Sequence, residues 1–202
     1  MYDILQWRTL HQLTLLVTAS GISGPKAEPD SEDATELKKK LWDNESFEEW
    51  GETYNTYVKH TSPLFCHRTD LTLISYRDVT AVYFTSVAFL PLLQASSKAR
   101  GDMAASIIVI SSMSGIMRQA QGHFSYNAAK GGTVHLAKLM SGEFTKASIR
   151  VNSIAPGYFP SEMTAKESGD NQKSQLPDEK IQEKGHVPMQ RAGADEEMAM
   201  GK

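Results

Sequence analysis

Residues 106–115 read SIIVISSMSG, an apolar run that changes abruptly to serines and a glycine. The apolar part is unbroken and rich in β-branched residues, which is typical of a strand in a parallel sheet covered by helices on both faces. We therefore predict a strand over 106–110, with Ser111, Ser112 and Ser114 just past its carboxyl end. Open α/β sheets bind their ligands at that end of the strands.

The sequence on either side of this strand predicts a βαβ unit. Residues 125–147 have apolar positions at the three- and four-residue spacing of a long helix, and 149–154 form a second short strand that ends before Pro156-Gly157. Further upstream, 13–17 predict another buried strand and 79–93 an apolar helix that Pro91 kinks or ends. Strands alternating with helices in this way favour a parallel α/β sheet.

Tyr126 and Lys130 stand four residues apart on the predicted helix, so both side chains lie on one face. Taken alone, this spacing fits a surface tyrosine beside a solvated lysine equally well. Two neighbouring segments favour a functional pair. The serines follow the preceding strand, and the Pro156-Gly157 turn follows the next one. Both segments and the start of the helix lead to the same edge of the sheet.

Three segments resemble the short-chain dehydrogenase/reductase family. SSMSG (111–115), SYNAAKGG (125–132) and RVNSIAPGYFPSEM (150–163) are similar to its serine segment, its Tyr-x-x-x-Lys helix and its Pro-Gly turn, in the same order. With GISGP and VYFTSVAFLPLL, the resemblance covers most of 13–165, and it is greatest to reductases of 3-oxoacyl-[acyl-carrier-protein] type.

The resemblance implies an α/β fold: a partial Rossmann-like doubly wound parallel sheet containing only the central and C-terminal strands. It makes 1–202 a single incomplete NAD(P)-binding domain. The reaction it implies is NADP-dependent reduction of a carbonyl to an alcohol, or the reverse, with a 3-oxoacyl thioester as one substrate class.

The resemblance also implies roles for three catalytic residues. Tyr126 would be the general acid that protonates the alkoxide left by hydride transfer. A tyrosine phenol ordinarily ionises near pH 10, and a neighbouring cation favours the phenolate; Lys130 would be that cation and would also hold the nicotinamide ribose. Ser112 would orient the carbonyl, with Ser114 as the second choice and Ser111 as a structural residue; the interval from Ser112 to Tyr126 is one residue longer than the usual family arrangement.

Cofactor contacts are expected from Gly21, Pro156, Gly157 and Ser161 in addition to Tyr126 and Lys130. For Ser161, a solvated loop serine is an equally good interpretation. NADP is the expected cofactor, with NAD as the alternative, because the residue that reads the ribose 2′ position follows a strand that the sequence does not show.

LVTASGISG, residues 16–24, looks like the glycine-rich turn that binds a dinucleotide pyrophosphate. Such a turn opens a helix whose amide groups face the phosphates, whereas here Pro25, Pro29 and an acidic cluster follow. We assign Thr18-Ala19-Ser20-Gly21 instead to a degraded form of the family's later Asn-Asn-Ala-Gly motif. The first three strands and the phosphate turn are then expected upstream of Met1.

Three other segments stand apart from the predicted sheet. Residues 25–52 are polar and acidic, with a short helix around 34–42, and are expected to be a surface excursion. Residues 57–78 show no resemblance to the family and are expected to be an insert, either a gene-model artefact or an authentic surface loop. Residues 162–202 are expected to be a mobile tail with some helix.

Composition narrows the remaining classes of function. A net charge of −3 and a pI near 6.1 predict neither nucleic acid nor a membrane as partner, and the one cysteine favours a cytoplasmic location. The six histidines show no metal-ligand spacing. A homo-oligomer is typical of the family, although the insert and the expected truncation of the domain at both ends weigh against one. The alternative function is a catalytically silent fragment without the half that binds the dinucleotide phosphates; the RVNSIAPG segment argues against the related sugar-nucleotide epimerases.

Overall fold

The computed structural model describes residues 11–54 except 20 and 22, residues 79–161 except 102, and residues 177–182 and 187–200. The predicted insert 57–78 and the first part of the predicted tail, 162–176, lie outside the described residues. Contacts divide the chain into two compact units, Met1–Ser153 and Ile154–Lys202, which are described separately below.

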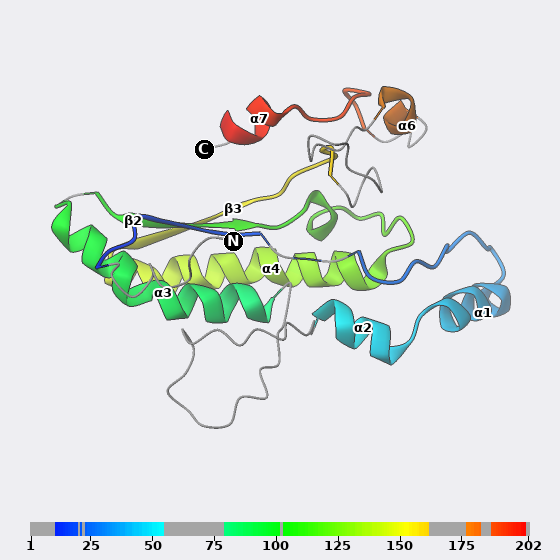
Figure 1. The fold of residues 1–202 in the computed structure, drawn as a ribbon. Helices are drawn as coiled ribbons and strands as arrows, with labels where there is room; N and C mark the ends of the chain where they lie inside the picture. The colour runs from blue at the N-terminus through cyan, green and yellow to red at the C-terminus, as the bar shows by residue number, and fades with distance from the viewer. Residues whose placement is uncertain are drawn as a thin grey trace, which may run out of the picture. The chain divides into compact units, whose positions relative to one another are not determined.

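The first unit contains a three-stranded sheet (Figure 1). Its strands are β1 (Leu15–Thr18), β2 (Ala105–Ile110) and β3 (Ile149–Ile154), in the order β1-β2-β3. β1 and β2 are parallel, with Leu16 opposite Ile107 and Thr18 opposite Val109. The predicted α/β sheet and its three strands are thereby confirmed, each within about two residues of its predicted bounds.

Two long helices, α3 (Thr80–Ala99) and α4 (Phe124–Phe144), lie along one face of this sheet (Figure 1). Alternate residues of β2 point toward them, so that Ala105, Ile107 and Val109 are fully buried while the residues between are half-buried. Burial of such apolar side chains stabilises the fold by about 1.5–3 kcal/mol each. The remaining buried members of this core are Val82, Leu93, Ala137, Met140, Ile149 and Val151.

Pro91 is predicted to kink or end the helix over 79–93; the ending is wrong, because α3 continues through Pro91 to Ala99, and the kink stays a prediction. Proline removes one backbone donor, but Pro91 lies on the exposed side of the helix, where water can satisfy the carbonyl that loses its partner. The turns beyond it are held by tertiary contacts, since Leu93 and Ser96 are fully buried against the sheet. Packing therefore outweighs the local cost of the proline.

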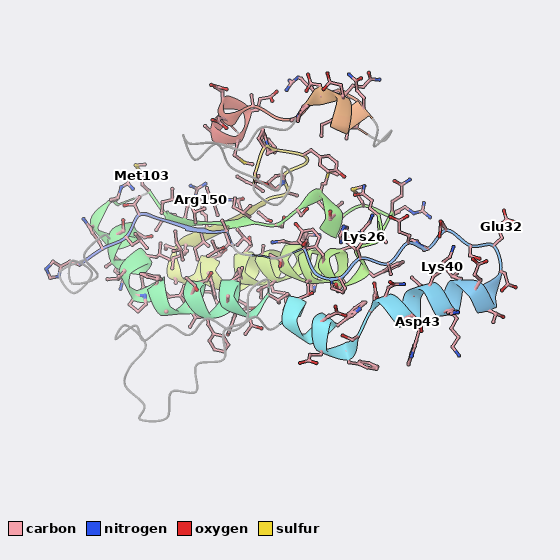
Figure 2. All side chains as sticks on the ribbon, turned by 45° about the vertical axis from the view of Figure 1, so that its right-hand side comes forward. Lys26, Glu32, Lys40, Asp43, Met103 and Arg150 are labelled. Atoms are coloured by element: carbon pink, nitrogen blue, oxygen red, sulfur yellow. The ribbon has the colours of Figure 1, made fainter. Side chains whose placement is uncertain are left out.

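The acidic segment after β1 contains two helices, α1 (Ala34–Asn44) and α2 (Phe47–Tyr54). α1 confirms the predicted short helix; it is capped by Asp33 and has no buried residue. Figure 2 shows the charged side chains along it, among them Lys40 and Asp43. α2 was not predicted, although its sequence carries a capping box: Glu49 N donates to Ser46 Oγ at 3.2 Å and Ser46 N donates to Glu49 Oε2 at 3.0 Å.

The second unit has two short helices, α6 (Asp178–Gln182) and α7 (Asp195–Met200). Gly193 N donates to Tyr158 O at 2.8 Å, and the Phe159 ring lies so close to Gly193 that a side chain there would overlap it. These contacts join the stretch just after β3 to the segment that leads into α7. Part of the predicted tail is therefore in regular structure.

Candidate active site

The serines after β2 are placed at its carboxyl end, as predicted. Ser111 and Ser112 are nearly fully buried, and Ser112 caps the short 3-10 helix η3 (Met113–Gly115) by accepting a hydrogen bond from Ser114 N at 3.1 Å. This bond uses a lone pair of Ser112 Oγ and leaves its hydroxyl proton available for donation. Ser153 Oγ donates to Ser111 Oγ at 2.9 Å, so Ser111 joins the end of β2 to β3.

Tyr126 and Lys130 lie one turn apart near the start of α4. Lys130 is 4% exposed, and its Nζ lies 5.8 Å from the centroid of the half-buried Tyr126 ring. A buried ammonium is costly unless it interacts with polar or π groups, and the ring provides one such contact. The predicted pair is therefore a close pair within the fold rather than two solvated side chains.

A close backbone contact holds the serine turn against the tyrosine helix. A methyl group on Gly115 would lie 2.5 Å from the carbonyl carbon and 2.6 Å from the carbonyl oxygen of Lys130. Only a glycine permits η3 to approach α4 so closely, and Gly131 faces the same contact. The turn that begins at Ser112 is thus packed directly on the helix that carries Tyr126 and Lys130.

The other predicted site residues fall into two groups. Gly21 follows β1, whose carboxyl end lies at the same edge of the sheet as that of β2. Pro156, Gly157 and Ser161 belong to the second unit, so their contribution to this site stays a prediction. Sequence reasoning singled out Ser112, Tyr126 and Lys130 but missed the packing role of Gly115, although the Ser-x-x-Gly pattern contained the signal.

A cavity of about 630 Å³ in the described part of the chain lies elsewhere. Its lining includes Lys98 from the last turn of α3, and Ala104, Lys146 and Arg150 near the amino ends of β2 and β3. Figure 2 labels Arg150. This is the edge of the sheet opposite Ser112, so the cavity is separate from the candidate active site.

Two further classes of site are absent from the described residues. No group of three or more histidine, cysteine, aspartate or glutamate side chains is placed to hold a metal ion there. Within those same ranges, no helix combines the length and apolar character needed to cross a bilayer.

The fold and the site define an α/β protein with a serine just past the carboxyl end of a central strand, and a tyrosine and a lysine near the start of the helix that follows. A family model described as short chain dehydrogenase matches residues 68–172, just over half of the chain, and the chain belongs to that family. The matched range begins at residue 68, inside the segment 57–78, and the insert stays a prediction.

Curated relatives agree with this assignment. The chain is 31% identical over 156 residues to the short-chain dehydrogenase/reductase PhomF of Diaporthe leptostromiformis, covering 76% of this chain and 46% of that protein. It is 34% identical over 122 residues to the rhamnolipids biosynthesis 3-oxoacyl-[acyl-carrier-protein] reductase of Pseudomonas aeruginosa, covering 60% and 44%. The chain thus spans about half the length of these relatives.

A solved structure shows the same fold. The Pseudomonas aeruginosa RhlG/NADP active-site complex matches with a TM-score of 0.62 at 24% identity, covering 96% of this chain and 58% of that one. The three-stranded sheet with its helices is therefore part of a Rossmann fold.

Proposed function

We propose that this chain works as an NADP-dependent oxidoreductase that reduces a carbonyl to an alcohol or catalyses the reverse reaction. The observation that carries the proposal is the buried Lys130 ammonium, 5.8 Å from the Tyr126 ring, on a helix against which the Ser112 turn is packed. A 3-oxoacyl thioester is the substrate class to test first, because a reductase named for that activity is among the relatives.

The chemistry follows from what each side chain offers. In the direction of reduction, the Ser112 hydroxyl donates a hydrogen bond to the carbonyl oxygen and orients it. As negative charge develops on that oxygen, the Tyr126 phenol transfers its proton to it. The Lys130 ammonium stabilises the phenolate that remains. A bound nicotinamide dinucleotide would supply the hydride that adds to the carbonyl carbon.

The residues present fit one end of such a cofactor. A buried ammonium beside a phenol is suited to hold the hydroxyls of the nicotinamide ribose, and Lys130 has that position. In the described residues no helix follows β1 directly, so this part of the chain holds no helix N-terminus there for the pyrophosphate. The relatives favour neither cofactor alone: the structural match is an NADP complex, and another relative is an NADH-dependent L-xylulose reductase.

The proposal is tested by NADPH oxidation with the purified chain and a 3-oxoacyl thioester. Replacing Tyr126 with phenylalanine removes only the hydroxyl, and we expect kcat/KM to fall by about 100-fold or more because the general acid is lost. Tyr83→Phe is the matched control, since Tyr83 lies exposed on α3 and should leave the rate unchanged. Equal rates for wild type and Tyr126→Phe would refute the proposal.

The alternative is a catalytically silent fragment, and the observation in its favour is that the chain spans about half the length of its relatives. Calorimetry with NADPH and NADH separates the two functions. An oxidoreductase should bind at least one of them, with affinity reduced by Lys130→Met, whereas a silent fragment should bind neither.

A further inference from the structure

The first turn of α4, which carries Tyr126, has no side-chain cap of its own. His123 stands at the N-cap position without a capping hydrogen bond. An uncapped helix start leaves amide groups unsatisfied and is the part of a helix most prone to fray. Since Tyr126 is only three residues away, something else must hold it in place.

Tertiary contacts hold both chain neighbours of Tyr126. Asn127 Nδ2 donates to the carbonyls of Gln119 at 3.2 Å and Ala120 at 3.1 Å, in the loop before the helix. On the other side, Ser125 is completely buried and its hydroxyl lies 3.5 Å from that of Thr53, which is also completely buried in α2.

The segment after β1 also packs against the contact between Thr53 and Ser125. Gly24 has a φ of +65°, and a methyl group there would lie 2.6 Å from Ser125 Oγ and 2.7 Å from Thr53 Oγ1. Both the backbone angle and the lack of space require glycine. Two residues of the same loop add to the contact, because Ala27 N donates to Gly122 O at 2.8 Å and the Lys26 stem packs on Gly122.

We infer that Gly24, Thr53 and Ser125, here called the α4 brace, are positioning residues for Tyr126. The inference rests on the proposed function. It assigns a role to the acidic excursion: α2 fixes the first turn of α4 so that the tyrosine hydroxyl meets the substrate in one orientation. Consistent with this role, α2 lies beside the start of α4 (Figure 1).

The geometry decides which parts of the brace matter most. Thr53 Oγ1 donates to Glu49 O at 2.9 Å and is also directed at Ser125 Oγ, 3.5 Å away, so its single proton serves mainly the shorter of the two bonds. At 3.5 Å that bond is weak. The brace therefore acts mainly through packing of two buried side chains on Gly24, and the methyl of Thr53, 3.4 Å from a Cβ on Gly24, is part of it.

The test measures kcat and KM of Thr53→Ala, which removes both methyl and hydroxyl from the contact. We expect kcat to fall about tenfold with KM changed less than twofold, since small misplacements of reacting groups reduce rates steeply. We also expect the pH profile of kcat to shift, because the surroundings of the proton donor change. Ser125→Ala should act in the same direction, and Thr53→Val, which keeps the buried volume, should recover most of the rate.

Ser97→Ala is the matched control, because Ser97 is a buried hydroxyl at the opposite edge, bonded to Ala105 N and Ser148 O. It should lower stability while kcat and its pH profile stay as in wild type. In an active chain, a Thr53→Ala rate no lower than that of Ser97→Ala, or a change in KM alone, would show that the brace has no positioning role.

A second readout keeps this test separate from the proposed function. Amide hydrogen exchange over residues 124–130 should be at least about tenfold faster in Thr53→Ala than in Ser97→Ala at matched stability, whether or not the chain turns over. Faster exchange in a chain without activity would support the brace and refute the oxidoreductase. Unchanged exchange would overturn the inference even in an active enzyme.

Discussion

At the scale of single residues, Gly115 decides how close the serine turn comes to the tyrosine helix. The contact is made by backbone atoms of Lys130, which cannot move aside as the end of a flexible side chain can. A side chain at this position must therefore displace the whole turn. Ser112, which opens that turn, would move with it.

We predict that Gly115→Ala lowers kcat/KM by about tenfold or more and reduces the free energy of unfolding by about 1–3 kcal/mol, the usual cost of overpacking. Turnover and urea denaturation measure the two effects. Gly142→Ala is the control, at a position on α4 where a methyl group meets nothing within 4 Å; alanine should stabilise α4 by up to about 1 kcal/mol there. A fully active Gly115→Ala protein would show that the close contact does not position Ser112.

At the scale of elements, α7 shows how one carboxylate organises a helix start. Glu197 Oε2 accepts hydrogen bonds from Ala194 N at 2.8 Å and from Arg191 Nη1 at 2.9 Å, and its Oε1 accepts from Arg191 Nη2 at 2.8 Å. The hydrogen bonds from Arg191, followed by the backbone bond from Ala194, lower the pKa of Glu197 from 4.5 to about 2.

The pH dependence of α7 follows from that shift. Because the pKa is lowered on folding, the stabilisation is fully present above pH 4.5 and is lost as the pH falls toward 2. We expect the carboxyl ¹³C resonance of Glu197 to titrate near pH 2, and Arg191→Gln to move that midpoint back toward its ordinary value. A midpoint near 4.5 in the unmodified chain would contradict the contact. The groups are exposed, so high salt should weaken the effect.

At the scale of the whole molecule, the described helices α3 and α4 of the first unit both lie on one face of its sheet. On the other face, Leu15 and Val17 of β1 are 47% and 51% exposed. β1 is also an edge strand in the described order β1-β2-β3, and an edge strand presents unpaired backbone groups. Apolar side chains beside an open edge favour association between chains.

We predict that the purified chain self-associates at micromolar concentration and that Val17→Lys reduces this association, because a charged residue on an edge strand disfavours pairing. Analytical ultracentrifugation over a range of concentrations measures it. Leu16→Lys is the contrasting variant, since Leu16 packs on the core and a charge there should unfold the unit. A wild-type chain that sediments as a monomer at every concentration would show that this surface does not mediate self-association.

Local patterns in the sequence were sufficient for several features. The β-branched run of β2, the three- and four-residue spacing of α4 and the positions of Ser112, Tyr126 and Lys130 could all be read directly, because strand alternation, helix periodicity and a four-residue spacing act between near neighbours. The start of α2 also has a local signal, the capping box from Ser46 to Glu49.

Contacts between distant parts of the chain decided the rest. The continuation of α3 past Pro91 depends on burial of Leu93 and Ser96 against the sheet. The position of the Ser112 turn depends on the close contact between Gly115 and the backbone of Lys130. Thr53 and Ser125 are 72 residues apart, yet they meet beside Tyr126. The sequence by itself determined which residues carry the proposed chemistry. Only the tertiary structure decided what holds them in place, because such packing depends on which surfaces meet and no periodic pattern records it.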